Sequence, residues 1–163
     1  MNMSLKITLI AGASMVASLI PASASAELYQ QKCMMCHQAA GAGLPNVFPP
    51  LAESEWVNGP AENLIRIQLR GLTGPITVKG NKYASVMPPN AAMTDEEIAS
   101  VLTYVRSNFG NKADAVTPEM VKKFRGEVGK PMLKVEDLID PAKAEAPEKK
   151  EEPKTEKAEE PKK

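Results

Sequence analysis

The sequence predicts one small domain that is rich in short helices and poor in strands. Two segments carry apolar residues at helical spacing and begin with residues that favour a helix start. Only one pair of short extended pieces, flanked by glycines, interrupts this pattern. About 137 of the 163 residues follow position 26, which is enough for a single domain.

The N-terminus has the layout of a secretory signal peptide. Lys6 precedes an apolar run at residues 7–20, and the small residues "PASASA" follow it. A run of 14 residues is short for a membrane span, which needs about 20. No later segment is long and apolar enough to span a membrane. We therefore expect residues 1–26 to be removed on export, although cleavage after Ala24 satisfies the small-residue pattern as well as cleavage after Ala26.

The first half of the mature chain predicts two helices and a hairpin. A short helix is expected from Leu28 into the cysteine pair, followed by a Gly- and Pro-rich loop at residues 39–54. A second helix is expected at residues 61–72, where Leu64, Ile65, Gln68, Leu69 and Leu72 lie on related turns. Gly74-Pro75 and Gly80-Asn81 then flank the extended pieces of a small hairpin.

The strongest helix prediction covers residues 93–110. Thr94 is suited to cap the helix and Glu97 follows three residues later, as in a capping box. One apolar stripe contains Ile98, Val101, Leu102 and Val105, and Gly110 is suited to end the helix.

The chain after residue 111 divides into an extension and a tail. Thr117 and Pro118 predict another helix start, and the apolar residues that follow predict that residues 112–141 pack on a domain at 27–111. Residues 142–163 contain 7 Lys and 7 Glu and no aliphatic residue larger than Ala. Such a segment buries too little apolar surface to offset its ordering entropy, so we expect a disordered tail.

The composition gives information about nucleic-acid binding and about the apolar side chains available for the core. The chain has 20 basic and 20 acidic residues, which gives no support to a nucleic-acid partner. One Trp, three Tyr and three Phe are few, because large rings supply much of a small domain's buried area. We expect a group outside the sequence to fill this gap.

Both cysteines and the only histidine lie together as Cys33, Cys36 and His37. A structural zinc site usually needs four Cys or His ligands, and an iron–sulfur cluster needs four thiolates. A thioredoxin-like pair belongs in a βαβ setting, which this sequence lacks. A disulfide across a two-residue loop would constrain little of the unfolded chain.

The remaining interpretation is the C-x-x-C-H sequence that attaches a c-type haem. Two thiols about one helical turn apart can form thioethers with the two vinyl groups on one porphyrin edge. His37 is then placed to bind the iron from one face. Export supports this interpretation because such attachment occurs in the bacterial periplasm. Haem would also supply the large apolar group that the core lacks.

The opposite iron ligand is expected to be a methionine, since no second histidine exists. Met34 and Met35 are too close to His37 in the sequence to reach the other face. Met87 lies 50 residues after His37 in "YASVMPPN", where two prolines stiffen the backbone, and it is the favoured ligand. Met93 is the weaker alternative, and Met120 and Met132 are interpreted as core filler.

The segments "LYQQKCMMCH", "FPPL", "YASVMPP" and "TDEEIASVLTYVRSNFGN" resemble the class I c-type cytochromes, in particular small bacterial monohaem periplasmic proteins. The resemblance covers about residues 28–111. It implies an all-α fold whose first and last helices cross beside the haem edge. It also implies thioethers at Cys33 and Cys36, with His37 and Met87 as the iron ligands. Pro49, or Pro50 in a shifted register, would accept a hydrogen bond from the imidazole.

Two aromatic residues, Trp56 and Tyr83, are candidates for pocket or propionate neighbours, and ordinary core packing explains them equally well.

The function expected from these features is one-electron transfer by a monomeric periplasmic carrier that is not itself an enzyme. Its partners would be a periplasmic dehydrogenase, a reductase or a membrane respiratory complex. Three alternatives remain: a cytochrome subunit of a dehydrogenase or reductase complex, an open-coordination haem protein that binds gas or peroxide, and a haem-free adaptor.

Overall fold

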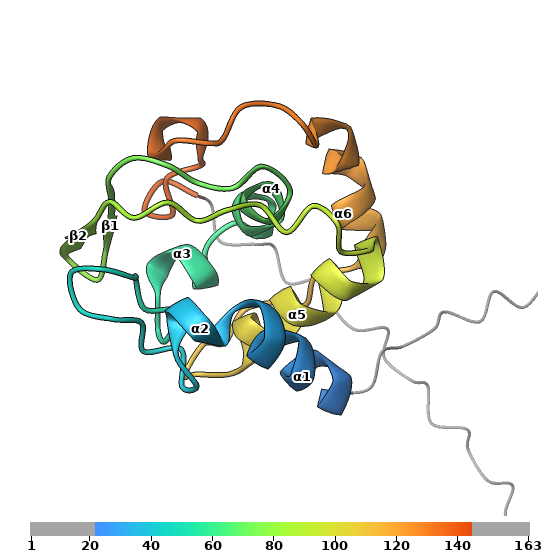
Figure 1. The fold of residues 1–163 in the computed structure, drawn as a ribbon, viewed down its shortest axis with the longest axis horizontal. Coiled ribbons are helices and arrows are strands. Elements are labelled where there is room, and N and C mark those ends of the chain that lie inside the picture. The colour runs from blue at the N-terminus through green and yellow to red at the C-terminus, as the bar shows by residue number, and fades with distance from the viewer. Residues whose placement is uncertain (1–21, 145–163) are drawn as a thin grey trace, which may run out of the picture.

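The computed structural model describes residues 22–144, and most of the predicted signal peptide and tail lie outside this range. Figure 1 shows short helices folded around a central space, with a small hairpin at one side. The described part is all-α in class, as predicted, since its two strands have three residues each. The helices are α1 Ala22–Lys32, α2 Met34–His37, α3 Glu55–Asn58, α4 Ala61–Arg70, α5 Asp95–Ser107 and α6 Pro118–Phe124. The strands are β1 Ile76–Val78 and β2 Asn81–Tyr83, and the 3₁₀ turns are η1 Arg125–Glu127 and η2 Val135–Asp137.

The contact between α1 and α5 forms one side of the core (Figure 1). Tyr29 of α1 is 1% exposed and packs against Tyr104 and Phe109, with ring centroids 5.7 and 5.0 Å away. The loop after α2 passes directly over Phe109, because a Cβ at Gly41 would lie 2.7 Å from that ring. Aromatic packing therefore holds α1 against α5 and the residues that follow it.

The first helix begins earlier than the sequence predicts, at Ala22 and not at Leu28. The additional turns are stabilised by tertiary contact, because Ser25 is buried and its hydroxyl pairs with that of Ser100 on α5. The short helix α3 was not predicted either. It begins where the Ser54 hydroxyl accepts a hydrogen bond from the backbone N–H of Trp56.

The hairpin and the capped helices agree with their predictions. The strands β1 and β2 pair antiparallel, with Ile76 opposite Tyr83. Lys79 and Gly80 join the strands, and their positive φ angles of 49° and 77° suit the tight turns that hairpins favour. Thr94 and Glu97 form the expected capping box of α5, and Thr117 caps α6. The helix α5 ends at Ser107, three residues before Gly110.

The extension at residues 112–141 wraps around α4 and α5. The helix α6 contacts both, and the chain then runs over α4 toward the hairpin side, as the orange segment of Figure 1 shows. Leu133 is fully buried, and its backbone N–H and C=O bond to Gly71 and Thr73. Arg70 donates two hydrogen bonds to the carbonyl of Pro131, at 2.9 and 2.7 Å. Backbone and side-chain contacts thus fix the extension along the end of α4.

The burial of Leu133 makes a testable prediction about the extension. We expect Leu133→Ala to lower the free energy of unfolding by about 2–5 kcal/mol, the usual cost of truncating a buried leucine. Val128→Ala is the matched control, since Val128 belongs to the same extension but is 44% exposed, and its effect should stay within about 0.5 kcal/mol. Denaturant unfolding of the purified protein measures both. Equal effects would show that the extension is not part of the folded unit.

Candidate cofactor site

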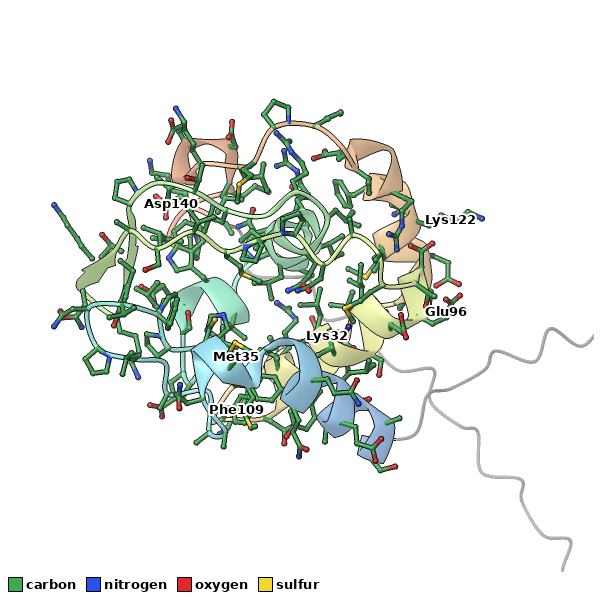
Figure 2. The ribbon with its side chains drawn as sticks, in the orientation of Figure 1. Lys32, Met35, Glu96, Phe109, Lys122 and Asp140 are labelled. Atoms are coloured by element: carbon green, nitrogen blue, oxygen red, sulfur yellow. The ribbon has the colours of Figure 1, made fainter. Side chains whose placement is uncertain are left out.

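The cysteine pair and His37 lie where α1 passes into α2. Cys33 is the junction between the two helices, and its N–H bonds to the carbonyl of Tyr29 while its own carbonyl accepts from the N–H of His37. Cys33 and His37 are buried, whereas Met35 between them, labelled in Figure 2, is 87% exposed. The helical path thus directs the cysteines and the histidine inward and leaves Met35 outside.

These inward side chains line one cleft. Two adjoining hollows share six lining residues, Cys33, His37, Pro49, Leu72, Ile76 and Met87. The inner wall is mostly aliphatic and comes from α3, α4 and α5, with Val57, Leu64, Ile67, Val101, Leu102 and Val105. The cleft is therefore suited to a large apolar group that meets polar atoms at a few points.

The imidazole of His37 is held in one tautomer. Its Nδ1 lies 3.0 Å from the carbonyl oxygen of Pro49, and a carbonyl can only accept, so Nδ1 carries the proton. The other nitrogen, Nε2, then has a free lone pair for a metal. Burial lowers the pKa of His37, which outweighs the opposing effect of the Pro49 carbonyl. Pro50 lines the cleft but makes no hydrogen bond to His37.

The two thiols are free and close to the same cleft. Burial raises the pKa of Cys33 to about 11, and the neighbouring Cys36 adds to this effect. Within residues 22–144, no three His, Cys, Asp or Glu side chains gather in a way that could hold a metal ion.

The two candidate methionines lie in different surroundings. Met87 lines both hollows of the cleft, and its backbone N–H and C=O both bond to Leu72, each at 2.9 Å. Met93 is buried in the core cluster that contains Tyr29 and Ile98, and it does not line the cleft. Of the two candidates, Met87 therefore lies at the cleft and Met93 lies in the core.

The remaining methionines and the two aromatic candidates have structural contacts. Met120 packs against the core, and Met132 reaches Gly71 beside the Met87 segment. Trp56 and Tyr83 both line the cleft. Trp56 donates its indole N–H to the carbonyl of Thr77 at 2.8 Å, so this donor already has a protein partner.

Sequence reasoning gave no role to one residue of the cleft, Gln68. It belongs to the predicted stripe of the second helix, and the structure places its buried side chain on the inner wall. A polar residue at a core-facing position was the available signal.

A helical domain with these groups around one apolar cleft defines the class of c-type cytochromes. The residues fit a covalently attached haem, since two thiols lie near one edge and a histidine presents a free nitrogen.

Comparison with known proteins places the chain within that class. Residues 22–109 match the family model described as cytochrome c, and the chain belongs to this family. It is 42% identical over 111 residues to cytochrome c-552 of Thermus thermophilus, covering 63% of this chain and 84% of that protein. It is 31% identical over 124 residues to the cytochrome c subunit of the alcohol dehydrogenase (quinone) of Gluconacetobacter polyoxogenes. That match covers 74% of this chain and 26% of the subunit. The family, the fold and the haem c cofactor predicted from the sequence are confirmed, and the chain is a haem c electron-transfer protein.

The close approach of Gly71 to Met87 makes a prediction about this segment. A Cβ at Gly71 would lie 2.6 Å from the carbonyl oxygen of Met87, whereas a Cβ at Gly74 would meet nothing within 4 Å. Both glycines have positive φ, so each change to alanine should cost about 1–2 kcal/mol in backbone strain. We expect Gly71→Ala to lower the thermal unfolding temperature clearly more than Gly74→Ala. Equal shifts would contradict the close backbone packing at Met87.

Proposed function

We propose that this chain is a one-electron carrier in which Cys33 and Cys36 hold haem c through thioether bonds. His37 Nε2 and the Met87 sulfur are the groups that would hold its iron. The observation that carries this proposal is that all four side chains line one cleft while His37 has its Nδ1 occupied by Pro49. When bound, the haem supplies an iron that gains or loses one electron.

The chain's own residues limit what that iron can do. Pro49 keeps the imidazole ring in one orientation, and the pairing with Leu72 fixes the backbone of Met87. If His37 and Met87 both hold the iron, they would leave no position on it for a substrate. This supports a carrier over an enzyme or a gas-binding protein, and His/Met ligation favours a higher potential than other ligand sets.

Partners would approach the cleft at its exposed mouth. Cys36 is partly exposed there, and Val86, which lines the outer hollow, is also exposed. Such a surface suits brief contacts with small interfaces. We propose that the partners are periplasmic dehydrogenases, reductases or a membrane respiratory complex. The similarity to dehydrogenase cytochrome subunits supports this class, although the chain spans about a quarter of their length or less.

The assignment of Met87 predicts a spectroscopic result. Protein produced with a c-haem maturation system should be low-spin, with a weak sulfur-to-iron band at the red end of the visible spectrum. We expect Met87→Ala to lose this band and Met93→Ala to keep it, because Met93 lies in the core away from the cleft. A band that survives in Met87→Ala would contradict the assignment. A high-spin wild type that readily binds carbon monoxide would contradict the carrier function.

We further propose that the chain is exported and that cleavage follows Ala24. Within residues 22–144 every helix is too short or too polar to cross a bilayer. Cleavage after Ala26 would remove Ser25, whose hydroxyl pairs with Ser100, and would leave only residues 27–32 of α1. Cleavage after Ala24 keeps Ser25, a residue type that favours helix starts.

The processing site can be read from the mass of the exported protein. We expect the mature chain to begin at Ser25, because this retains the contact between α1 and α5. Intact-mass spectrometry of periplasmic protein distinguishes this start from one at Glu27, which would contradict the proposal.

A further inference from the structure

A guanidinium from the extension, that of Arg125, is bound to the chain between Met87 and α5. Its Nε donates to the Asp95 carboxylate at 2.8 Å, its Nη1 to the carbonyl of Ala91 at 3.0 Å and its Nη2 to the carbonyl of Met93 at 3.0 Å. Nη2 also lies 2.6 Å from the same oxygen of Asp95. All three nitrogens of the guanidinium are therefore engaged.

This contact requires the shape of an arginine side chain. Two carbonyls and a carboxylate are met at once, which the planar fork of a guanidinium can do and a single ammonium cannot. The side chains of Arg125 and Asp95 are 30% and 23% exposed, so the pair is partly shielded from water. Arg125 directly follows α6, which packs beside α5 (Figure 1), and it lies beyond residue 109, where the match to the family model ends. The contact thus belongs to the extension of this chain.

Arg125 acts on one end of the Met87 segment, which we define as residues 84–94 between β2 and α5. The other fixed points of this segment lie at and after α4. The backbone of Met87 is paired with Leu72, and Asn90 donates to α4 from both its side chain and its backbone. The turn between Asn90 and α5 is therefore the part of the segment that Arg125 fixes.

The Met87 segment occupies space at the cleft, since Ser85, Val86, Met87, Pro88 and Asn90 all line the outer hollow. An external ligand that took the place of the Met87 sulfur would need part of this space, so the segment would have to move first. A contact that resists the movement reduces the fraction of molecules that can bind such a ligand, and lowers its apparent affinity by the same factor. Arg125 lines neither hollow, so its effect on the cleft comes through the segment alone.

We propose that Arg125 is a positioning residue that keeps the Met87 segment in place and so protects Met87 from displacement by external ligands. This inference rests on the proposed ligation of iron by Met87. Through this one side chain, the extension restricts the protein to electron transfer, because the iron is seldom accessible to a small molecule.

The test measures imidazole binding to the oxidised, haem-loaded protein through the loss of the sulfur-to-iron band. We expect Arg125→Met, which keeps an unbranched apolar side chain and removes the donors, to bind imidazole about tenfold more tightly than the wild type. A tenfold change corresponds to about 1.4 kcal/mol, which is within what one hydrogen bond to a charged group contributes.

Arg66→Met is the matched control, because Arg66 also ties the extension to α4. Its guanidinium bonds to Glu127 at 3.2 Å and to the carbonyl of Asp137 at 2.8 Å, and it lines neither hollow. We expect Arg66→Met to lower the thermal unfolding temperature and to leave the imidazole affinity within about twofold of the wild type, a difference of less than about 0.5 kcal/mol.

Amide hydrogen exchange tests the same contact without relying on the iron ligand. The N–H of Asn90 bonds to the carbonyl of Gln68, and the N–H of Met93 bonds to the carbonyl of Asn90. In Arg125→Met these two amides should exchange faster relative to the amides in the middle of α5, because the segment is loosened locally. If Arg125→Met does not load haem, Arg125→Lys takes its place, since lysine keeps the charge without the fork. The expected direction is the same.

Equal imidazole affinities in the Arg125 and Arg66 variants would overturn the inference and would leave the ligation by Met87 intact. Exchange that rises equally in the segment and in α5 would also overturn it, because Arg125 would then act only on global stability. A wild type whose band does not depend on Met87 would contradict the proposed function itself and the inference with it.

Discussion

The reciprocal backbone hydrogen bonds between Leu72 and Met87 are the interaction on which the rest of the cleft depends. Leu72 uses both its N–H and its C=O on Met87, while Gly71 and Thr73 on either side bond to Leu133. Residues 71–73, Met87 and Leu133, which are distant in the sequence, therefore meet around Leu72. Gly71 permits this approach because it has no Cβ, which would lie 2.6 Å from the Met87 carbonyl. Together with the two bonds from Asn90 to Gln68, these bonds hold the Met87 segment against the end of α4.

The two walls of the cleft are built by different kinds of contact. The His37 side is largely local, since a short helical path places Cys33, Cys36 and His37, and a loop twelve residues later returns Pro49 to the imidazole. The Met87 side depends on long-range contacts, from α4 through Leu72 and from the extension through Leu133. Packing of the extension against α4 thus supports the ligand loop without lining the cleft itself.

This difference explains what the sequence could predict. The C-x-x-C-H motif, the Thr94–Glu97 box and the Gly74-Pro75 and Gly80-Asn81 pairs are local patterns, and the structure forms the helices and the hairpin at these places. The start of α1 at Ala22 depends on Ser100 of a distant helix, so local sequence could not place it. The side chain of Gln68 is held by Asn90, which lies 22 residues later in the chain. The sequence shows a polar residue, Gln68, on a core-facing stripe. Its hydrogen-bond partner, Asn90, is known only from the tertiary structure.

The late position of Leu133 in the chain has a consequence for how the molecule matures. If the chain is exported with its N-terminus first, as proposed, the C-x-x-C-H motif would leave the membrane 96 residues before Leu133. The hydrogen bonds of Leu133 with Gly71 and Thr73, on either side of Leu72, would then be among the later contacts to form around the Met87 segment.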